Sequence, residues 1–173
     1  MSTRLFRVIV PVNTLEAAVP FYSTLLGLPG FRVSGGRHYF PSGDVIVALY
    51  DPSGDGDDRL PRPNFGHLYF AVDDLEAAYL RAQATGGLST GRGDGGLPMG
   101  EIAKRPWGER SFYLSDPFGN PLCFVDAATC SLAPRDRFGR QQARGPHPLS
   151  GRRPYNRPSD VETPAAEAAR VSR

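Results

Sequence analysis

The chain has few cysteines and no long apolar stretch, whereas many cysteines are typical of small disulfide-linked proteins and long apolar stretches of membrane-spanning proteins. Its 173 residues include only two cysteines, Cys123 and Cys130, which form no C-x-x-C motif. Neither a disulfide framework nor a zinc knuckle is expected. No apolar stretch approaches the roughly 20 residues that a membrane span needs. The N-terminus has a basic start, a short apolar stretch and no small-residue cleavage site, so we expect a first strand rather than a signal peptide, and a cytoplasmic protein.

The composition is that of a folded domain with a different C-terminal segment. Hydrophobic residues make up 40% of the chain and charged residues 22%, close to globular averages. Residues 1–126 hold 11 Arg and Lys against 14 Asp and Glu, a net charge of −3, whereas residues 127–173 hold 9 against 4, a net charge of +5. The second stretch is rich in Pro, Gly and Arg and shows no hydrophobic periodicity, which predicts a flexible basic tail.

The charge of this tail allows two interpretations. It suits an anion-binding or nucleic-acid-binding arm, or a solvated extension of the domain. Because the segment carries no interleaved aromatic pattern and no motif, the extension is favoured and a nucleic-acid partner is not expected.

An internal repeat is the most informative pattern. Shifting the chain by 60 residues lays 7–18 over 67–78, with Val12 matching Val72 and the four residues Leu-Glu-Ala-Ala identical. Internal symmetry of this kind constrains the whole fold. In each copy, apolar residues alternate along a strand and then recur at helical spacing. The repeat therefore predicts a duplicated strand-to-helix unit.

Caps and turns complete each unit. Asn13 with Glu16, and Asp73 with Glu76, have the spacing of a capping box, and Gly27 and Gly86 suit the helix ends. Pro20 conflicts with this assignment, because a proline beyond the first turn costs about 3 kcal/mol or kinks the helix. Turn signals divide the remaining apolar segments into three further strands per unit, at 31–34, 37–40 and 45–50, and at 100–105, 110–114 and 122–125.

The order is thus βαβββ twice, and the segments that carry it resemble a known superfamily. These are VIVPVNTLEAAVPFYSTLLGL, HLYFAVDDLEAA and EIAKRPWGERSFYLSDPFGNPLCFVD. Over about residues 4–126 the chain resembles the vicinal-oxygen-chelate superfamily, which includes glyoxalase I, extradiol dioxygenases and bleomycin-resistance proteins, and its ending is similar to that of the bleomycin-binding branch.

The resemblance implies an α+β fold in which two tandem βαβββ modules form a curved mixed sheet with a concave ligand groove. The modules are expected at 4–52 and 65–126, with a linker at 53–64 and the tail at 127–173. The resemblance also implies a homodimer, with each groove built between modules of one or two chains.

Superfamily enzymes hold one divalent metal on the concave face, and the resemblance places its ligand positions here at Arg7, His67, Cys123 and approximately Val47. Only His67 is a usual ligand. A catalytic ion needs about three imidazole or carboxylate ligands, and the cation of Arg7 would repel it. We therefore expect no metal cofactor, although Cys123 could ligate a softer metal.

The same concave face supplies candidate ligand contacts. His67 is a ligand contact, a general base or a hydrogen-bonded remnant, and Arg7 binds an anionic group or pairs with Glu101 or Glu109. Aromatic side chains could hold a flat ligand or belong to the core. The candidate ligand-binding residues are Arg7, Tyr39, Phe65, His67, Tyr69, Trp107, Tyr113 and Cys123.

We expect a metal-free protein that sequesters a small aromatic or cationic molecule, as in antibiotic resistance, since the −3 charge of residues 1–126 weakly favours a cation. The alternative is a metal-dependent lyase, isomerase or dioxygenase of the same superfamily. A third interpretation is a scaffold or regulatory module whose tail binds a partner.

Overall fold

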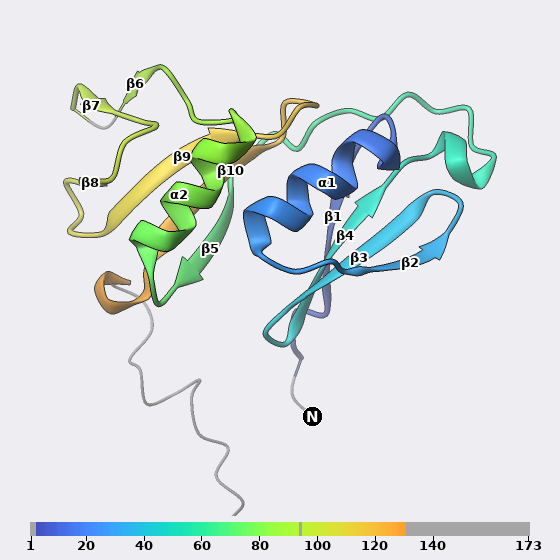
Figure 1. Cartoon of the computed structure of the whole chain (residues 1–173), viewed down its shortest axis with the longest axis horizontal. Coiled ribbons are helices and arrows are strands. Elements are labelled where there is room, and N and C mark those ends of the chain that lie inside the picture. The colour runs from blue at the N-terminus through green and yellow to red at the C-terminus, as the bar shows by residue number, and fades with distance from the viewer. Residues whose placement is uncertain (1–2, 94, 131–173) are drawn as a thin grey trace, which may run out of the picture.

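Two successive units, each with one helix and one four-stranded sheet, make up the part of the chain that the structure describes, residues 3–93 and 95–130 (Figure 1). The structure is a computed structural model. The first sheet has the strand order β1-β4-β3-β2, in which β1 and β4 run parallel and the other pairs antiparallel. Its elements are β1 (Arg7–Pro11), α1 (Leu15–Leu26), β2 (Phe31–Ser34), β3 (Arg37–Ser42) and β4 (Val45–Tyr50).

The second unit repeats this arrangement with the strand order β5-β10-β9-β8, and β5 runs parallel to β10. Its elements are β5 (Leu68–Val72), α2 (Leu75–Thr85), β8 (Ala103–Lys104), β9 (Arg110–Ser115) and β10 (Pro121–Asp126). The expected βαβββ duplication and the α+β class are therefore confirmed. None of the helices in the described residues is long and apolar enough to cross a membrane.

Short elements fill the connections. A 3-10 turn, η1 (Ser53–Asp55), lies in the predicted linker, and a small hairpin of β6 (Arg92–Gly93) and β7 (Leu97–Pro98) lies in the connection from α2 to β8. A second 3-10 turn, η2 (Ala127–Thr129), continues the ordered chain past the predicted boundary at residue 126. The rest of the predicted tail, from residue 131, lies outside the described residues.

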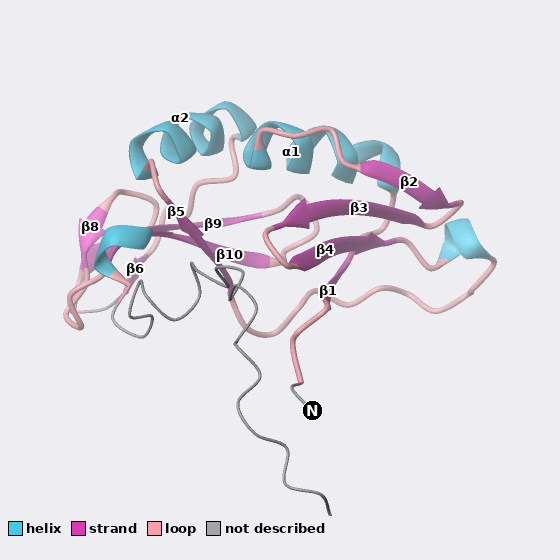
Figure 2. Ribbon diagram, turned by 90° about the horizontal axis from the view of Figure 1, so that it is seen from below, coloured by secondary structure: helices cyan, strands magenta, loops and turns pink. Residues whose placement is uncertain are grey.

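Both helices cover the same side of the two sheets, as Figure 2 shows. Strand alternation sends Val10, Phe40, Leu49, Phe112 and Phe124 toward the helices, where they are buried in one core. The opposite side, which no described helix covers, is called the open face below. On the first sheet it carries Arg7, Ile9, Phe31, Tyr39 and Ala48, and on the second His67, Tyr69, Tyr113, Cys123 and Val125.

The helix caps differ from the prediction by one residue. The N-cap of α1 is Thr14, whose hydroxyl accepts a hydrogen bond from the Glu16 amide, and the N-cap of α2 is Asp74, whose carboxylate accepts from the Ala77 amide. The predicted caps Asn13 and Asp73 are therefore wrong, because the neighbouring residue is equally able to cap and has the required extended backbone. Gly27 and Gly86 end the helices with positive φ angles, as predicted.

Two other expectations need correction. The strand predicted at 100–105 shrinks to Ala103–Lys104, because residues 99–101 form a bend and the Arg105 carbonyl accepts the Gly108 amide in the turn that leads to β9. Pro20 stays inside α1, where it is exposed and lies only one turn beyond the first. A proline so near the start withholds a single helical hydrogen bond, the one to the Glu16 carbonyl.

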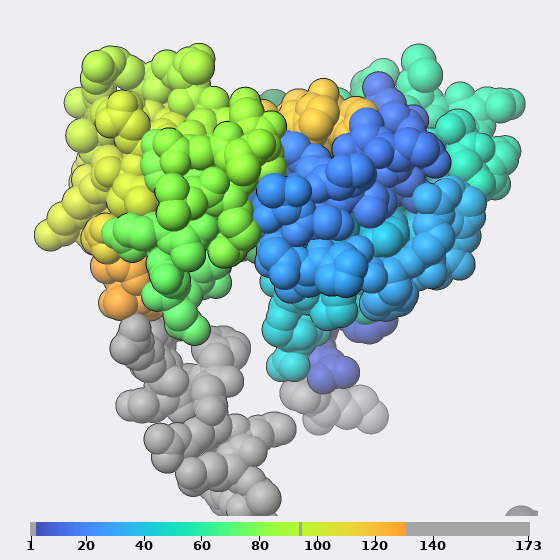
Figure 3. Space-filling view, viewed as in Figure 1, coloured from blue at the N-terminus to red at the C-terminus, as the bar shows by residue number. Residues whose placement is uncertain are grey.

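A buried polar network joins the two units. The carboxylate of Asp116 accepts hydrogen bonds from the Tyr22 hydroxyl of α1 at 3.0 Å and from the amides of Phe118 and Asn120 at 2.9 and 2.7 Å. The Asn120 side chain donates to Asp116 and to the Pro11 carbonyl at the end of β1. In Figure 3 this turn appears in yellow-orange against the blue first unit.

The linker between the two units also takes part in this hydrogen-bond network. The side-chain oxygen of Asn120 accepts from the Asn64 amide at 2.8 Å, and the Asn64 side chain donates to the Ile9 carbonyl at 3.1 Å. The desolvation of Tyr22 beside the Asp116 carboxylate raises the pKa of its hydroxyl, which therefore stays a donor. The segment that connects the units and the turn before β10 are thus held to the same strand, β1.

Substituting Tyr22→Phe is expected to lower the free energy of unfolding by about 1.5–3 kcal/mol, the usual cost of losing a hydrogen bond to a buried charged group. Urea unfolding followed by circular dichroism measures the change. The matched control is Tyr79→Phe on α2, expected to stay within about 0.5 kcal/mol because no hydrogen bond of its hydroxyl is described. Equal losses in the two variants would contradict the role given to Tyr22.

Candidate functional site

Four predicted site residues lie together on the open face of the second sheet. Cys123 on β10 pairs with Tyr69 on β5 and with Tyr113 on β9. The ring of His67, just before β5, lies edge-on to Tyr113 with the centroids 5.0 Å apart, and 6.1 Å from the ring of Tyr69. His67 and Tyr69 are exposed, whereas Tyr113 and Cys123 are buried. The exposed imidazole of His67 therefore lies beside the rings of Tyr69 and Tyr113.

A loop covers the buried half of this group. Cys123 is 0% exposed and packs with Tyr113, Val125, Met99 and Cys130 in a small cluster separate from the main core. Burial raises the pKa of the Cys123 thiol to about 12. Burial therefore favours the neutral thiol, and the covering loop keeps it out of contact with solvent.

Arg105 holds this covering loop in place. It is 2% exposed, and its guanidinium donates to Ser111 Oγ and to the carbonyls of Pro98, Met99, Glu101 and Ser111. Its charge also lies over the Tyr113 ring, 4.8 Å from the centroid. Sequence reasoning missed Arg105 and Met99, because a side chain that folds back from a strand end onto its own loop leaves no periodic signal.

Arg7 and Tyr39 lie on the open face of the first sheet. The guanidinium carbon of Arg7 lies 4.6 Å from the Tyr39 ring centroid and 5.1 Å from that of Phe6. Arg7 therefore reaches from β1 across β4 to β3, and its contacts are aromatic. The ion pair considered with Glu101 or Glu109 does not form in the described residues; Glu109 instead accepts a hydrogen bond from the Trp107 indole at 2.8 Å.

The remaining predicted site residues lie elsewhere. Trp107, 48% exposed, sits in the turn before β9, at the opposite end of the second sheet from His67. Phe65 is fully exposed ahead of β5. Val47, the approximate fourth metal position, points into the helix-side core, and the open-face residues of β4 are its neighbours Ile46 and Ala48. That placement was wrong by one residue, which in a strand moves the side chain to the other face.

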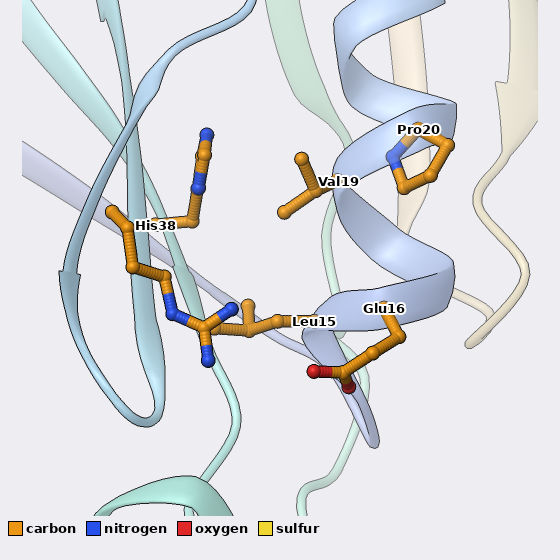
Figure 4. Close-up of a pocket in the computed structure, with 6 residues that line it drawn as sticks. Leu15, Glu16, Val19, Pro20 and His38 are labelled. Carbon is orange, nitrogen blue, oxygen red and sulfur yellow. The ribbon is translucent and has the colours of Figure 1, made fainter.

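Two hollows lie in the described residues, one within the first unit and one between the units. One, of about 490 Å³, lies between α1 and the β2–β3 hairpin, where Leu15 and Val19 point toward His38 (Figure 4). His38 is anchored through Nε2, 2.9 Å from the Pro29 carbonyl oxygen. The other, of about 240 Å³, lies between the β3–β4 turn and strand β5. None of the predicted ligand-binding residues lines either hollow.

The donor set of the open faces does not suit a catalytic divalent ion. A site of this kind needs about three imidazole, carboxylate or thiolate ligands with a position left open. Among residues 3–93 and 95–130 no group of three such side chains comes together. The positions at which the resemblance placed metal ligands supply an arginine cation, an imidazole and a fully buried thiol.

Comparison with known proteins places these features in a family. The family model described as the Glyoxalase/Bleomycin resistance protein/Dioxygenase superfamily matches residues 4–124. A comparison with curated proteins finds no match.

Solved structures show the same architecture. A lactoylglutathione lyase from Agrobacterium tumefaciens is 21% identical, with a TM-score of 0.54 over 75% of this chain and 98% of that one. A glyoxalase/bleomycin resistance protein from Albidiferax ferrireducens T118 is 24% identical, with a TM-score of 0.55 over 70% and 97%. Oxidase ChaP-H2 is 25% identical, with a TM-score of 0.56 over 73% and 94%. These likenesses support the shared fold.

Untagged full-length protein titrated with Zn²⁺, Ni²⁺ or Mn²⁺ in a calorimeter at pH 7.5 is expected to bind no ion at one per chain with a Kd below about 10 µM, because residues 3–93 and 95–130 place no second and third ligand beside His67. The variant His67→Ala should give the same trace as the original chain. One tightly held ion per chain that disappears in His67→Ala would show that the donor set does suit a metal.

Proposed function

Since the chain belongs to the Glyoxalase/Bleomycin resistance protein/Dioxygenase superfamily, we propose that it binds and sequesters a small drug or metabolite on its open faces without a catalytic metal. One observation carries the proposal: the open face exposes aromatic and polar side chains, while the side chains at the expected metal positions do not form a suitable ligand set for a divalent ion. His67 and Tyr69 stand exposed beside Tyr113, and Cys123, which could have joined His67 as a ligand, is a buried thiol.

One observation favours the enzyme alternative. His67 is an exposed imidazole on the face where ligands are expected, and an imidazole is a common general acid or base in enzymes. Two of the similar structures bear the names lactoylglutathione lyase and oxidase. A lyase, isomerase or dioxygenase would still need an electrophile or metal that these side chains do not assemble.

The proposed setting is a cytoplasmic homodimer that confers resistance by keeping a drug bound. Exposed apolar side chains on the open face of the first sheet, Ile9 and Phe31 among them, support a second copy as the cover. An exposed patch of this kind is commonly an association surface. A groove closed by a partner would bury more of a ligand than one open sheet can.

The experiment that tests the function is a thermal-shift screen with antibiotics, including bleomycin, together with thiol conjugates and catechols. A ligand of the native state raises the Tm by mass action, equivalent to about 2.7 kcal/mol at a hundredfold excess over Kd. We expect at least one compound to raise the Tm of the original chain, and Tyr69→Ala to remove at least half of that shift. Leu80→Ala, on the exposed side of α2, is the matched control and should change nothing.

Two outcomes of the screen would contradict sequestration. A stabilising compound that is converted to product, with mass spectrometry showing turnover lost in His67→Ala, would favour the enzyme. A screen without a single stabilising compound would leave the open faces without the proposed role.

Introducing a charged side chain on the open face tests the proposed dimer. Light scattering after gel filtration should give a dimer for the original chain and a monomer for Ile9→Lys, because an unpaired lysine is costly to bury in an apolar interface. Leu80→Lys places the same charge on the helix side and should remain dimeric. A monomeric original chain, or dissociation by Leu80→Lys alone, would refute the proposed interface.

A further inference from the structure

The hollow between α1 and the β2–β3 hairpin contains a nearly buried histidine. Its volume of about 490 Å³ lies within the range of small-molecule sites. Val19 points from α1 toward His38 on β3, which is 8% exposed (Figure 4). Strand alternation puts His38 on the helix side with Phe40, and the two rings lie 4.9 Å apart. A polar ring therefore lies at the edge of the core, where it lines the hollow.

The hydrogen bonding of His38 leaves one ring nitrogen for a ligand. Nε2 lies 2.9 Å from the Pro29 carbonyl oxygen, and because a carbonyl only accepts, Nε2 is the donor of this bond. In the neutral ring Nδ1 is then an acceptor. Within residues 3–93 and 95–130 Nδ1 makes no hydrogen bond, and unlike Arg7 Nε it is not fully covered. Nδ1 can therefore be reached from the hollow that its side chain lines.

Arg32 provides a donor on the same side of the sheet. Arg32 on β2 is the register partner of His38, so the two side chains lie next to each other, and both line the hollow. Its Nε donates to the Ser34 carbonyl at 2.7 Å and its Nη2 donates to the Gly35 carbonyl. Nη1 is left without an acceptor in the part of the chain that the structure describes. The hollow therefore combines an acceptor, Nδ1 of His38, with a donor, Nη1 of Arg32.

The charges around the hollow offset each other. Glu16, at the start of α1, is the acidic residue in its lining, and Arg32 is the basic one. The hydrogen bond from the Thr14 hydroxyl lowers the pKa of the Glu16 carboxyl most, and the charge of Arg32 lowers it further. The rest of the lining, apart from His38, is apolar: Leu15, Val19 and Pro20. A lining of this kind favours an uncharged, largely apolar molecule.

We propose that this hollow binds a small neutral alcohol or phenol, whose hydroxyl donates to Nδ1 of His38 and accepts from Arg32. A hydroxyl suits this pair because it is both a donor and an acceptor. The apolar body of the ligand lies against Leu15, Val19 and Pro20. The site is on the helix side of the first sheet, separate from the open faces, and therefore goes beyond the proposed function.

Matched compounds test the hydroxyl. Naphthalene, ethylbenzene and cyclohexane scaffolds are each offered as the phenol or alcohol, as its methyl ether and as the carboxylate, and Kd values are measured by calorimetry at pH 8.0. For the original chain we expect at least one hydroxyl compound to bind about fivefold or more tightly than its ether, because the ether leaves Nδ1 without a donor. The carboxylate should bind no better than the ether, because it has no proton to donate to Nδ1 and Glu16 repels it.

The ring nitrogens of His38 report the contact directly. In protein labelled with ¹⁵N-histidine, long-range ¹H–¹⁵N NMR spectra distinguish a protonated from an unprotonated ring nitrogen. We expect His38 at pH 8.0 to carry its proton on Nε2, and the Nδ1 resonance to move to lower frequency when the hydroxyl compound binds. The spectrum of His38→Gln identifies which of the three histidines of the chain is His38.

Variants locate the site. His38→Gln keeps an N–H that can reach the Pro29 carbonyl but removes Nδ1, and should reduce the preference for the hydroxyl to below about twofold. Val19→Phe fills the hollow and should weaken binding at least about tenfold. The matched control is Leu80→Phe, which places the same ring on the exposed side of α2 and should leave Kd unchanged. Circular dichroism and Tm show whether each variant keeps its fold, and the spectra of the original chain test the site without any variant.

Three results would overturn the inference. Ethers or carboxylates that bind as tightly as the hydroxyl compounds would do so, as would a proton found on Nδ1 of His38. A panel in which no hydroxyl compound binds with a Kd below about 1 mM would also do so. Binding that survives Val19→Phe but is lost in Tyr69→Ala would put the ligand on the open face, which overturns this site and supports the proposed function.

Discussion

The carboxylate of Asp116 is the constraint on which the arrangement of the two units depends. A charge that is 5% exposed must find several donors, and here they come from the turn that follows β9 and from Tyr22 on the other unit. The same turn orients Asn120 toward the end of β1. Satisfying one buried charge therefore fixes where β1 lies beside the second unit, and with it how the two open faces are placed. The D-P-x-G-N segment supported the family resemblance, and in the structure its physical role is to join the modules.

The repeat and the hydrophobic alternation were sufficient to predict two successive βαβββ units, because strand period and helix period are properties that a sequence displays directly. The family resemblance supplied how the strands of each unit form a sheet. The sequence pattern did not decide which residue caps each helix or where each strand ends. Asn13 and Thr14 are both capable caps, as are Asp73 and Asp74, and the backbone conformation selects between them. The Ala103–Lys104 strand is shorter than predicted because a bend precedes it and the turn to β9 begins at Arg105.

The candidate site was predictable only where a strand carries it. Arg7, Tyr69, Tyr113 and Cys123 share the open faces because alternation leaves no other choice once the core side is known. Val47 failed for the same reason, since an approximate position in a strand has an even chance of the wrong face. What covers Cys123, and therefore whether it can react, depends on the loop before β8 and on long side chains within it. No local pattern specifies such contacts.

Two arginines show how environment decides between structure and function. Arg105 is almost fully buried, and its guanidinium donates hydrogen bonds to backbone carbonyls and a hydroxyl of its own unit. It therefore closes the open face of the second sheet over Tyr113 and Cys123. Arg7 also lies over a tyrosine, but its Nε has no acceptor in the described part of the chain. Both units share the same scaffold, and a long loop covers the open face of the second sheet, whereas the side chain of Arg7 covers Tyr39 on the first. The exposed edge of the second sheet keeps the rings of His67 and Tyr69 uncovered, beside the part of the face that the loop and Arg105 close.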